Sequence, residues 1–275
     1  MDTGPAAWGR PLYERVLDAV GEVDGGPLLD VGCGTGQLCR LAADRGIEVR
    51  GVDADRAALA LAARLVPRAE LAIGELPTLP VPDRSAAAVS CVQVLMHVPN
   101  PLAALRELAR VARRGAPVVV TVWGPPEQCA VGAFGRALAP LLGRPGGDRR
   151  AGSGDRGAGP GDRRAGSGDR RAGSGDRRLA PGGPPPLSAP GRLTKLAELA
   201  GLSAAVEQDV RCAFDYPDER ALLAGLYAAE LGRRAVAAAG RAPVRKAVLA
   251  ALADYRTAEG GYRLENAFRM LVARA

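Results

Sequence analysis

The sequence predicts an α/β protein with a doubly wound, largely parallel sheet, and three features indicate this class. Apolar runs of strand length alternate with segments whose apolar residues recur at helical spacing. The first run, Leu28–Val31, ends in a loop with glycine at positions 32, 34 and 36. A second run, 47–53, ends in an acid, Asp53. Regular strand–helix–strand alternation implies parallel βαβ units, which place ligands at the carboxyl ends of their strands.

The first half of the chain shows local signals for each expected element. Segment 8–21 is expected to be an amphipathic helix, with Pro11 near its start and a glycine at its end. After the strand 47–53, Asp55 can cap a helix that runs to Leu65, and Pro67 prevents its continuation. The other expected elements are a helix after the glycine loop (37–43), strands at 69–73, 86–94 and 117–122, and a helix from 100 or 101 to 114.

The second half alternates less cleanly. A helix is expected after Gly191, followed by a strand at 204–213 and alanine-rich helical stretches at 218–239 and 244–255. The last segment, 262–273, alternates like a strand. Because it follows another strand without a βαβ rhythm, we expect an antiparallel pair at one edge of the sheet.

The glycine loop and Asp53 together indicate a nucleoside-binding site. Glycine lets the backbone turn tightly and lie against a ligand, and the amides of the following helix face back toward the loop. A dinucleotide fingerprint requires a small residue where this chain has Gln37, so Gln37 favours the D-x-G-x-G-x-G loop of S-adenosylmethionine (SAM) binders. A carboxylate at position 53 can accept both ribose hydroxyls and fits either cofactor. The plain structural alternative is a glycine turn beside a solvated acid.

Composition restricts the setting of the protein. No apolar run approaches the length of a membrane span, and the N-terminus lacks the order of a signal peptide. The five cysteines, at 33, 39, 91, 129 and 212, are odd in number and form no C-x-x-C pair, and four of them lie in apolar or helical contexts that indicate buried thiols. We therefore expect a reducing, cytoplasmic setting and no membrane partner.

A repeat of Asp-Arg-Arg-Ala-Gly-Ser-Gly occupies the segment after residue 143. It has no apolar residue that could offset the entropy of folding, so we expect a disordered insertion over 144–190. Its nine arginines and five aspartates between 146 and 190 supply +4 of the net charge of +7. An RNA-binding segment and a repeat expansion in a tolerant loop are both open. The lack of aromatic residues for base stacking favours the expansion, so nucleic acid is not the expected partner.

With these residues in place, the chain resembles the class I SAM-dependent methyltransferases, in particular the bacterial small-molecule, methyltransferase type 11-like members. The resemblance rests on Leu28–Gly36, on the region 79–111 around the fourth strand, and on the closing segment 262–273. It implies a Rossmann-like sheet of seven strands with helices on both faces and the last strand antiparallel. It also implies one domain in two parts, 1–143 and 191–275, interrupted by the insertion, with the helices of 218–255 as a lid.

The resemblance also implies roles for individual residues. Asp30, Gly32, Gly34 and Gly36 would line the methionine portion and the sugar, and Asp53 would hold the ribose hydroxyls. Ala54 would lie against the adenine, Glu75 would accept from its amino group, and Gln93 would face the methionine end. Ser85-Ala86-Ala87 departs from the family's usual Ser-Phe-Asp, and Glu75 is one methylene longer than the usual residue.

Methyl transfer from a sulfonium depends more on positioning than on acids and bases. For a hydroxyl acceptor a base helps, and His97 is the only histidine; the alternative is a structural loop histidine. Aromatic candidates for the acceptor pocket are Trp8, Tyr13, Trp123, Phe214, Tyr216 and Tyr227, each of which could equally be ordinary packing.

The expected function is therefore methyl transfer from SAM to a small-molecule acceptor, a metabolite, with S-adenosylhomocysteine (SAH) as the product and no metal. The alternatives left open are an RNA or protein methyltransferase and a SAM-binding protein without turnover. An NAD-linked oxidoreductase is disfavoured by Gln37. The apolar stripe of 218–255 would also suit a homodimer interface.

Overall fold

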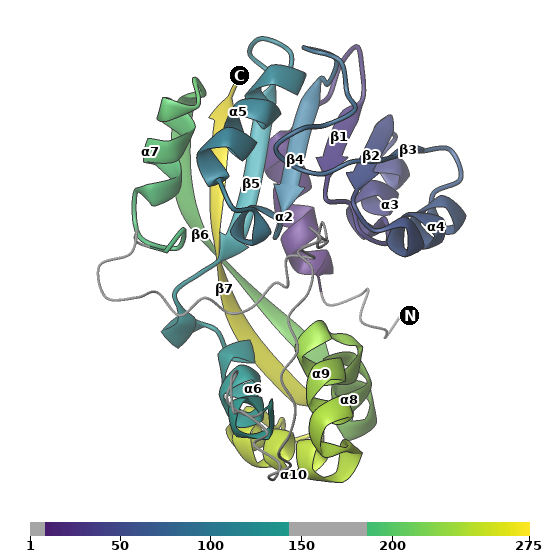
Figure 1. Ribbon diagram of the computed structural model, residues 1–275, viewed down its shortest axis with the longest axis vertical. Coiled ribbons are helices and arrows are strands. Elements are labelled where there is room, and N and C mark those ends of the chain that lie inside the picture. Colours follow the sequence, from purple (N-terminus) through teal and green to yellow (C-terminus); the bar gives the residue numbers. More distant parts are fainter. Residues whose placement is uncertain (1–8, 143–185) are drawn as a thin grey trace, which may run out of the picture.

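The computed structural model describes residues 9–142 and 186–275, and its centre is a seven-stranded sheet in the order β3-β2-β1-β4-β5-β7-β6 (Figure 1). The first five strands are parallel, and β7 runs antiparallel to both of its neighbours, β5 and β6. The predicted α/β class, with an antiparallel pair at one edge, is confirmed. The strands are β1 (Leu28–Val31), β2 (Val49–Asp53), β3 (Glu70–Ile73), β4 (Ala88–Val92), β5 (Pro117–Trp123), β6 (Ser203–Tyr216) and β7 (Tyr262–Arg274).

The helices follow the local signals of the sequence in the first half of the chain. The Asp55 side chain accepts from the amides of Ala57 and Ala58 and so caps α4, as predicted. Asn100 caps α5 in the same way through the Ala103 amide. The α-helices are α2 (Arg10–Val20), α3 (Gln37–Asp44), α4 (Arg56–Leu65), α5 (Pro101–Val111), α6 (Val131–Leu138), α7 (Arg192–Leu199), α8 (Glu219–Ala228), α9 (Glu230–Ala239) and α10 (Arg241–Ala251).

The main differences from the prediction lie in β4, α6 and the region 218–239. Strand β4 is shorter than 86–94 because Ala86 bonds to the end of α5 and Gln93 leaves the extended region with a φ of 60°. Helix α6 was not predicted. The expected helix 218–239 is two helices, because Ala229 has an extended backbone between α8 and α9.

Helices cover both faces of the sheet, as predicted. Helices α5 and α7 pack on one face through side chains such as Leu105, Leu108 and Leu193. Helices α2, α3 and α4 pack on the other through Val16 and Cys39, among others. All five cysteines are buried free thiols. No helix within the two described stretches is long and apolar enough to cross a membrane.

A third core lies beyond the carboxyl ends of the parallel strands. Strand β5 stops pairing at Trp123 opposite Phe268, whereas β6 and β7 continue together to the Tyr216–Tyr262 pair. Helices α6, α8, α9 and α10 gather around this extension (Figure 1). The apolar stripe of 218–255 is buried here, within the chain's own core, by residues that include Leu222, Leu226, Val244 and Val248.

The end of the predicted insertion is fixed to the edge of the sheet. Most of 144–190 lies outside the described residues, and the described chain resumes just before α7. The Glu207 carboxylate on β6 accepts from the amides of Gly191 (3.0 Å) and Thr194 (2.7 Å) at the start of α7. It also lies 3.6 Å from the Arg269 guanidinium, and both side chains are largely buried. Glu207 therefore joins α7 to the β6–β7 pair.

Replacing Glu207 by alanine removes the cap of α7 and leaves Arg269 with less compensation for its burial. We expect the free energy of unfolding to fall by about 3 kcal/mol in chemical denaturation. Asp209→Ala is the control, because Asp209 also pairs with Arg269 but is half exposed, and should cost under about 1 kcal/mol. Equal losses in the two variants would contradict this role for Glu207.

Candidate functional site

The glycine loop after β1 is shaped by its contacts with the rest of the domain. A Cβ at Gly32 would lie 2.2 Å from Val94, and one at Gly36 would lie 2.9 Å from Ala62 on α4. At Gly34, with a φ of 53°, a Cβ would meet nothing within 4 Å. Two of the glycines are therefore required by packing, and Gly34 borders open space where a ligand can lie.

The carboxylate of Asp53 ties this loop to the end of β2. Its Oδ2 accepts from the Gly34 amide at 2.7 Å, and its Oδ1 accepts from the Asp55 amide at 2.8 Å. A carboxylate offers about four acceptor positions, so two remain for further donors. Ala54, the next residue, is exposed.

Asp30 lies beneath the loop and is only 2% exposed. Its oxygens accept from the Ser90 hydroxyl at 2.8 Å and from the Cys39 thiol at 3.5 Å. Burial raises the pKa of Asp30 to about 6, and hydrogen bonds from these two donors oppose the shift. Burial, and then the charge of Asp30, raise the pKa of Tyr13 on α2 to about 12. The Asp30 carboxylate is thus hydrogen-bonded to side chains of β4 and α3.

Gln93 follows β4 and carries an unsatisfied acceptor atom. Its backbone amide donates to the Thr121 carbonyl (3.0 Å), and its side-chain Nε2 donates to the Thr121 hydroxyl (3.2 Å). Its Oε1 is buried and has no hydrogen-bond partner among the described residues. Such an atom costs about 1–3 kcal/mol, which a ligand donor would recover.

His97 ends the short 3₁₀ helix Leu95–His97 that follows Gln93. Its side chain is exposed, and its amide donates to the Val94 carbonyl at 2.8 Å. The predicted base is therefore accessible at the carboxyl end of β4.

Glu75 lies in a turn after β3, beside the end of β2. The Gly74 amide donates to the Asp53 carbonyl at 3.1 Å, and the Thr78 amide closes the turn on the Glu75 carbonyl at 3.0 Å. The structure thus brings the loop of Gly34, the Asp53 carboxylate and the Glu75 turn to one edge of the sheet.

An aromatic cluster lies at the carboxyl end of β5. Trp123 stacks on Phe268 with ring centroids 4.7 Å apart, and Phe214 lies 6.4 Å from Trp123. Phe268 was missed in the sequence, because nothing local indicates that it faces Trp123 across the β5–β7 pair. Of the other aromatic candidates, Tyr216 and Tyr227 belong to the third core, and Trp8 lies outside the described residues.

Comparison with known proteins matches residues 29–120 to a family model described as a methyltransferase domain. A ubiquinone biosynthesis O-methyltransferase of Alkalilimnicola ehrlichii is 36% identical over 116 residues, which are 40% of this chain and 47% of that protein. A demethylmenaquinone methyltransferase of Renibacterium salmoninarum is 36% identical over 117 residues, 42% of this chain and 49% of that protein. The chain spans about half the length of the curated relatives it matches.

Solved structures are similar over nearly the whole chain. The YcgJ protein of Bacillus subtilis has a TM-score of 0.55 at 15% identity and covers 96% of this chain and 98% of its own. The [4+2]-cyclase SpnF has a TM-score of 0.53 at 24% identity and covers 96% of this chain and 80% of its own. At these identities the likeness is one of fold.

The buried Asp30 predicts a pH dependence of stability. Because its folded pKa of about 6 lies above its ordinary value of 3.8, the folded protein holds this proton more tightly than the unfolded chain does. Stability should therefore fall by about 3 kcal/mol as the pH rises from 4 to 6 and then level off. The Asp30→Asn side chain does not titrate in this range. The difference in unfolding free energy between variant and wild type should therefore change by about 3 kcal/mol between pH 4 and 6. A difference that is constant across this pH range would contradict the assignment.

Proposed function

We propose that this protein, which carries a class I SAM-dependent methyltransferase domain, transfers a methyl group from SAM to a small-molecule acceptor. The observation that carries the proposal is the junction of Gly34 and Asp53. Three features meet there at one edge of the sheet. These are the Asp53 carboxylate, the glycine loop with open space at Gly34, and the turn of Glu75. The carboxyl ends of parallel strands are where doubly wound folds bind nucleosides.

The residues present fit SAM. Asp53 would hold the ribose hydroxyls with its two remaining acceptor positions, and Ala54 would lie against the adenine. Glu75 would accept from the adenine amino group. The orphaned Oε1 of Gln93 would accept from the ammonium of the methionine portion, which supplies the donor that this atom lacks.

Asp30, with Gly32 and Gly36, would support the loop from beneath, and the negative charge of Asp30 would favour a cationic ligand above it. When bound, SAM supplies a methyl group that is already activated by its sulfonium. The chain's task is then to hold the acceptor in line and to exclude water, and positioning of this kind can lower a barrier by about 7–11 kcal/mol.

The acceptor is proposed to be a small ring-bearing metabolite. The curated relatives are named for ubiquinone and demethylmenaquinone chemistry, and Trp123 and Phe214 offer aromatic surface near the carboxyl end of β5. The helices of the third core lie beyond the same strand ends, where they would act as the lid (Figure 1). We propose that one domain is formed by residues 1–143 and 191–275 and that residues 144–190 are an insertion in it.

A SAM-binding protein without methyl transfer is the second candidate. The fold alone does not distinguish a methyltransferase from other proteins, since the [4+2]-cyclase SpnF has a similar fold. Single-turnover assays with labelled SAM and a panel of phenolic and quinol acceptors separate the two, because only an enzyme converts the label to a methylated acceptor. An RNA or protein methyltransferase would instead be favoured by a strong rise in RNA affinity when residues 146–190 are kept rather than deleted.

The proposed setting is cytoplasmic and reducing, supported by the five free thiols. A homodimer would have to use a surface other than the apolar stripe of 218–255, since that stripe packs inside the chain.

Asp53→Ala should weaken SAH binding at least about 100-fold, because it removes the ribose acceptors and releases the Gly34 amide. Calorimetric titration of the full chain measures this. Asp55→Ala is the matched control: it removes the cap of α4, costs about 1 kcal/mol of stability and leaves affinity near wild type. Unchanged affinity in Asp53→Ala would reject the site.

His97→Gln should lower the rate of transfer to a hydroxyl acceptor by about 100-fold or more if His97 is the base, with SAH affinity unchanged. Single-turnover rates across pH 5–9 give the test. A rate and a pH profile identical to those of the wild type would leave His97 only a structural role.

A further inference from the structure

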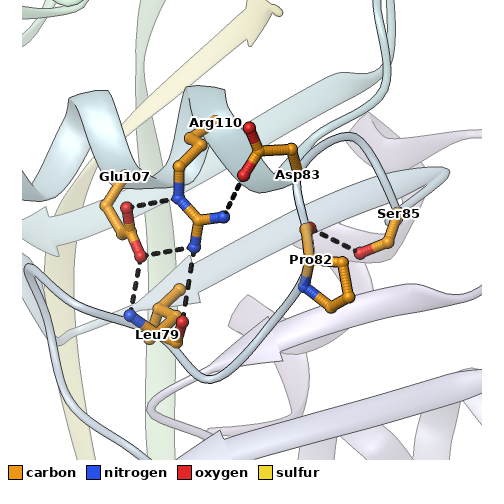
Figure 2. Close-up of polar contacts among 6 residues, drawn as sticks. All are labelled: Leu79, Pro82, Asp83, Ser85, Glu107 and Arg110. Atoms are coloured by element: carbon orange, nitrogen blue, oxygen red, sulfur yellow. Dashed lines mark hydrogen bonds and ion pairs between the residues drawn. The ribbon is translucent and has the colours of Figure 1, made fainter.

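A charge cluster joins helix α5 to the loop that connects β3 and β4 (Figure 2). Glu107 and Arg110, one turn apart on α5, form a bidentate ion pair. The Arg110 Nε donates to Glu107 Oε2 at 2.8 Å, and the Arg110 Nη2 donates to Glu107 Oε1 at 2.7 Å. The guanidinium also donates to the Asp83 carboxylate at 2.5 Å and to the Leu79 carbonyl at 3.3 Å. The Glu107 carboxylate accepts from the Leu79 amide at 2.6 Å. Both backbone polar groups of Leu79 are therefore held by this pair.

Burial and the number of hydrogen bonds hold the side chains of this cluster in fixed positions. The Glu107 side chain is only 11% exposed, and the Arg110 guanidinium holds the pKa of Glu107 below its usual value. Only the planar fork of arginine can engage Glu107 through two donors while it reaches Asp83 and Leu79. After Asp83 the loop continues along α5, since the amides of Arg84 and Ser85 donate to carbonyls at its end.

Glu75 lies between this cluster and the ribose site. On one side, Gly74 is bonded to the Asp53 carbonyl at 3.1 Å. On the other, Thr78 closes the turn and is followed at once by the clamped Leu79. The two ends of the turn touch, because a Cβ at Gly74 would lie 2.4 Å from the Pro80 ring. The backbone of Glu75 is thus fixed by two anchors, one on β2 and one on α5.

We propose that Arg110 and Glu107 are positioning residues for adenine recognition: by clamping Leu79, they hold Glu75 where its carboxylate accepts from the adenine amino group. The inference rests on the proposed SAM site. Neither residue belongs to the proposed SAM site, and their effect would reach it through the turn 75–78.

A comparison of two ligands isolates this effect. SAH carries the adenine amino group, whereas S-inosylhomocysteine carries an oxygen at that position, which would oppose the Glu75 carboxylate. The wild-type 275-residue chain should bind SAH about 10- to 100-fold more tightly than S-inosylhomocysteine in calorimetric titrations. Glu75→Gln should bring this ratio close to unity, because an amide can accept from one base and donate to the other.

Arg110→Met should lower the same ratio to within about threefold of unity, and adding it to Glu75→Gln should change the ratio no further. Glu107→Gln is a milder change that keeps an acceptor for Leu79 and should lower the ratio partly. It preserves the test if Arg110→Met does not fold. Arg106→Met is the matched control, because Arg106 is exposed on the same helix and, among residues 9–142 and 186–275, donates only to the Leu199 carbonyl. It should keep the wild-type ratio.

A merely structural role for Arg110 would weaken both ligands equally, and that result would overturn the inference. So would an Arg110→Met effect that adds fully to that of Glu75→Gln, or a wild type that binds both ligands equally. A wild type that binds neither ligand would contradict the proposed function itself.

Discussion

The hydrogen bond between the Gly34 amide and the Asp53 carboxylate joins the two strands on which the site depends. It closes the glycine loop over the ends of β1 and β2. The loop keeps this form because Gly36 lies against Ala62 on α4 and Gly32 lies against Val94 after β4. A side chain at either glycine would push these elements apart. The shape of the site is therefore a consequence of how three strands and a helix pack, and the open face at Gly34 is the part left for a ligand.

The two halves of the sheet have different tasks. The parallel half carries the polar groups at its strand ends, and a charge cluster on α5 fixes the loop of Glu75 beside them. The antiparallel pair β6–β7 extends beyond the ends of the parallel strands, and a second group of helices packs around this extension in its own core. Trp123, Phe214 and Phe268 lie where these two parts meet. Glu207 fastens the chain to the sheet edge at the point where it returns from the long insertion.

Local signals were enough to predict most of the fold. Asp55, Asn100 and the glycine loop act on neighbouring residues, so their effects are visible in the sequence. Contacts between distant residues were not visible. Asp30 accepts a hydrogen bond from Ser90, sixty positions away, and no local pattern could show this contact. The stacking of Phe268 on Trp123 and the break in the helix at Ala229 likewise depend on tertiary packing within alanine-rich or alternating segments.

Calorimetric titration of the 275-residue chain with SAM, SAH and NAD⁺ in parallel tests the central claim most directly, because the ligand decides the class of reaction. The account predicts micromolar binding of SAM and SAH and no heat from NAD⁺. Binding of NAD⁺ alone would contradict it, because the residues around Gly34, Asp53 and Gln93 would then serve a different cofactor. Binding of none of the three would show that the junction of Gly34 and Asp53 is only a structural turn.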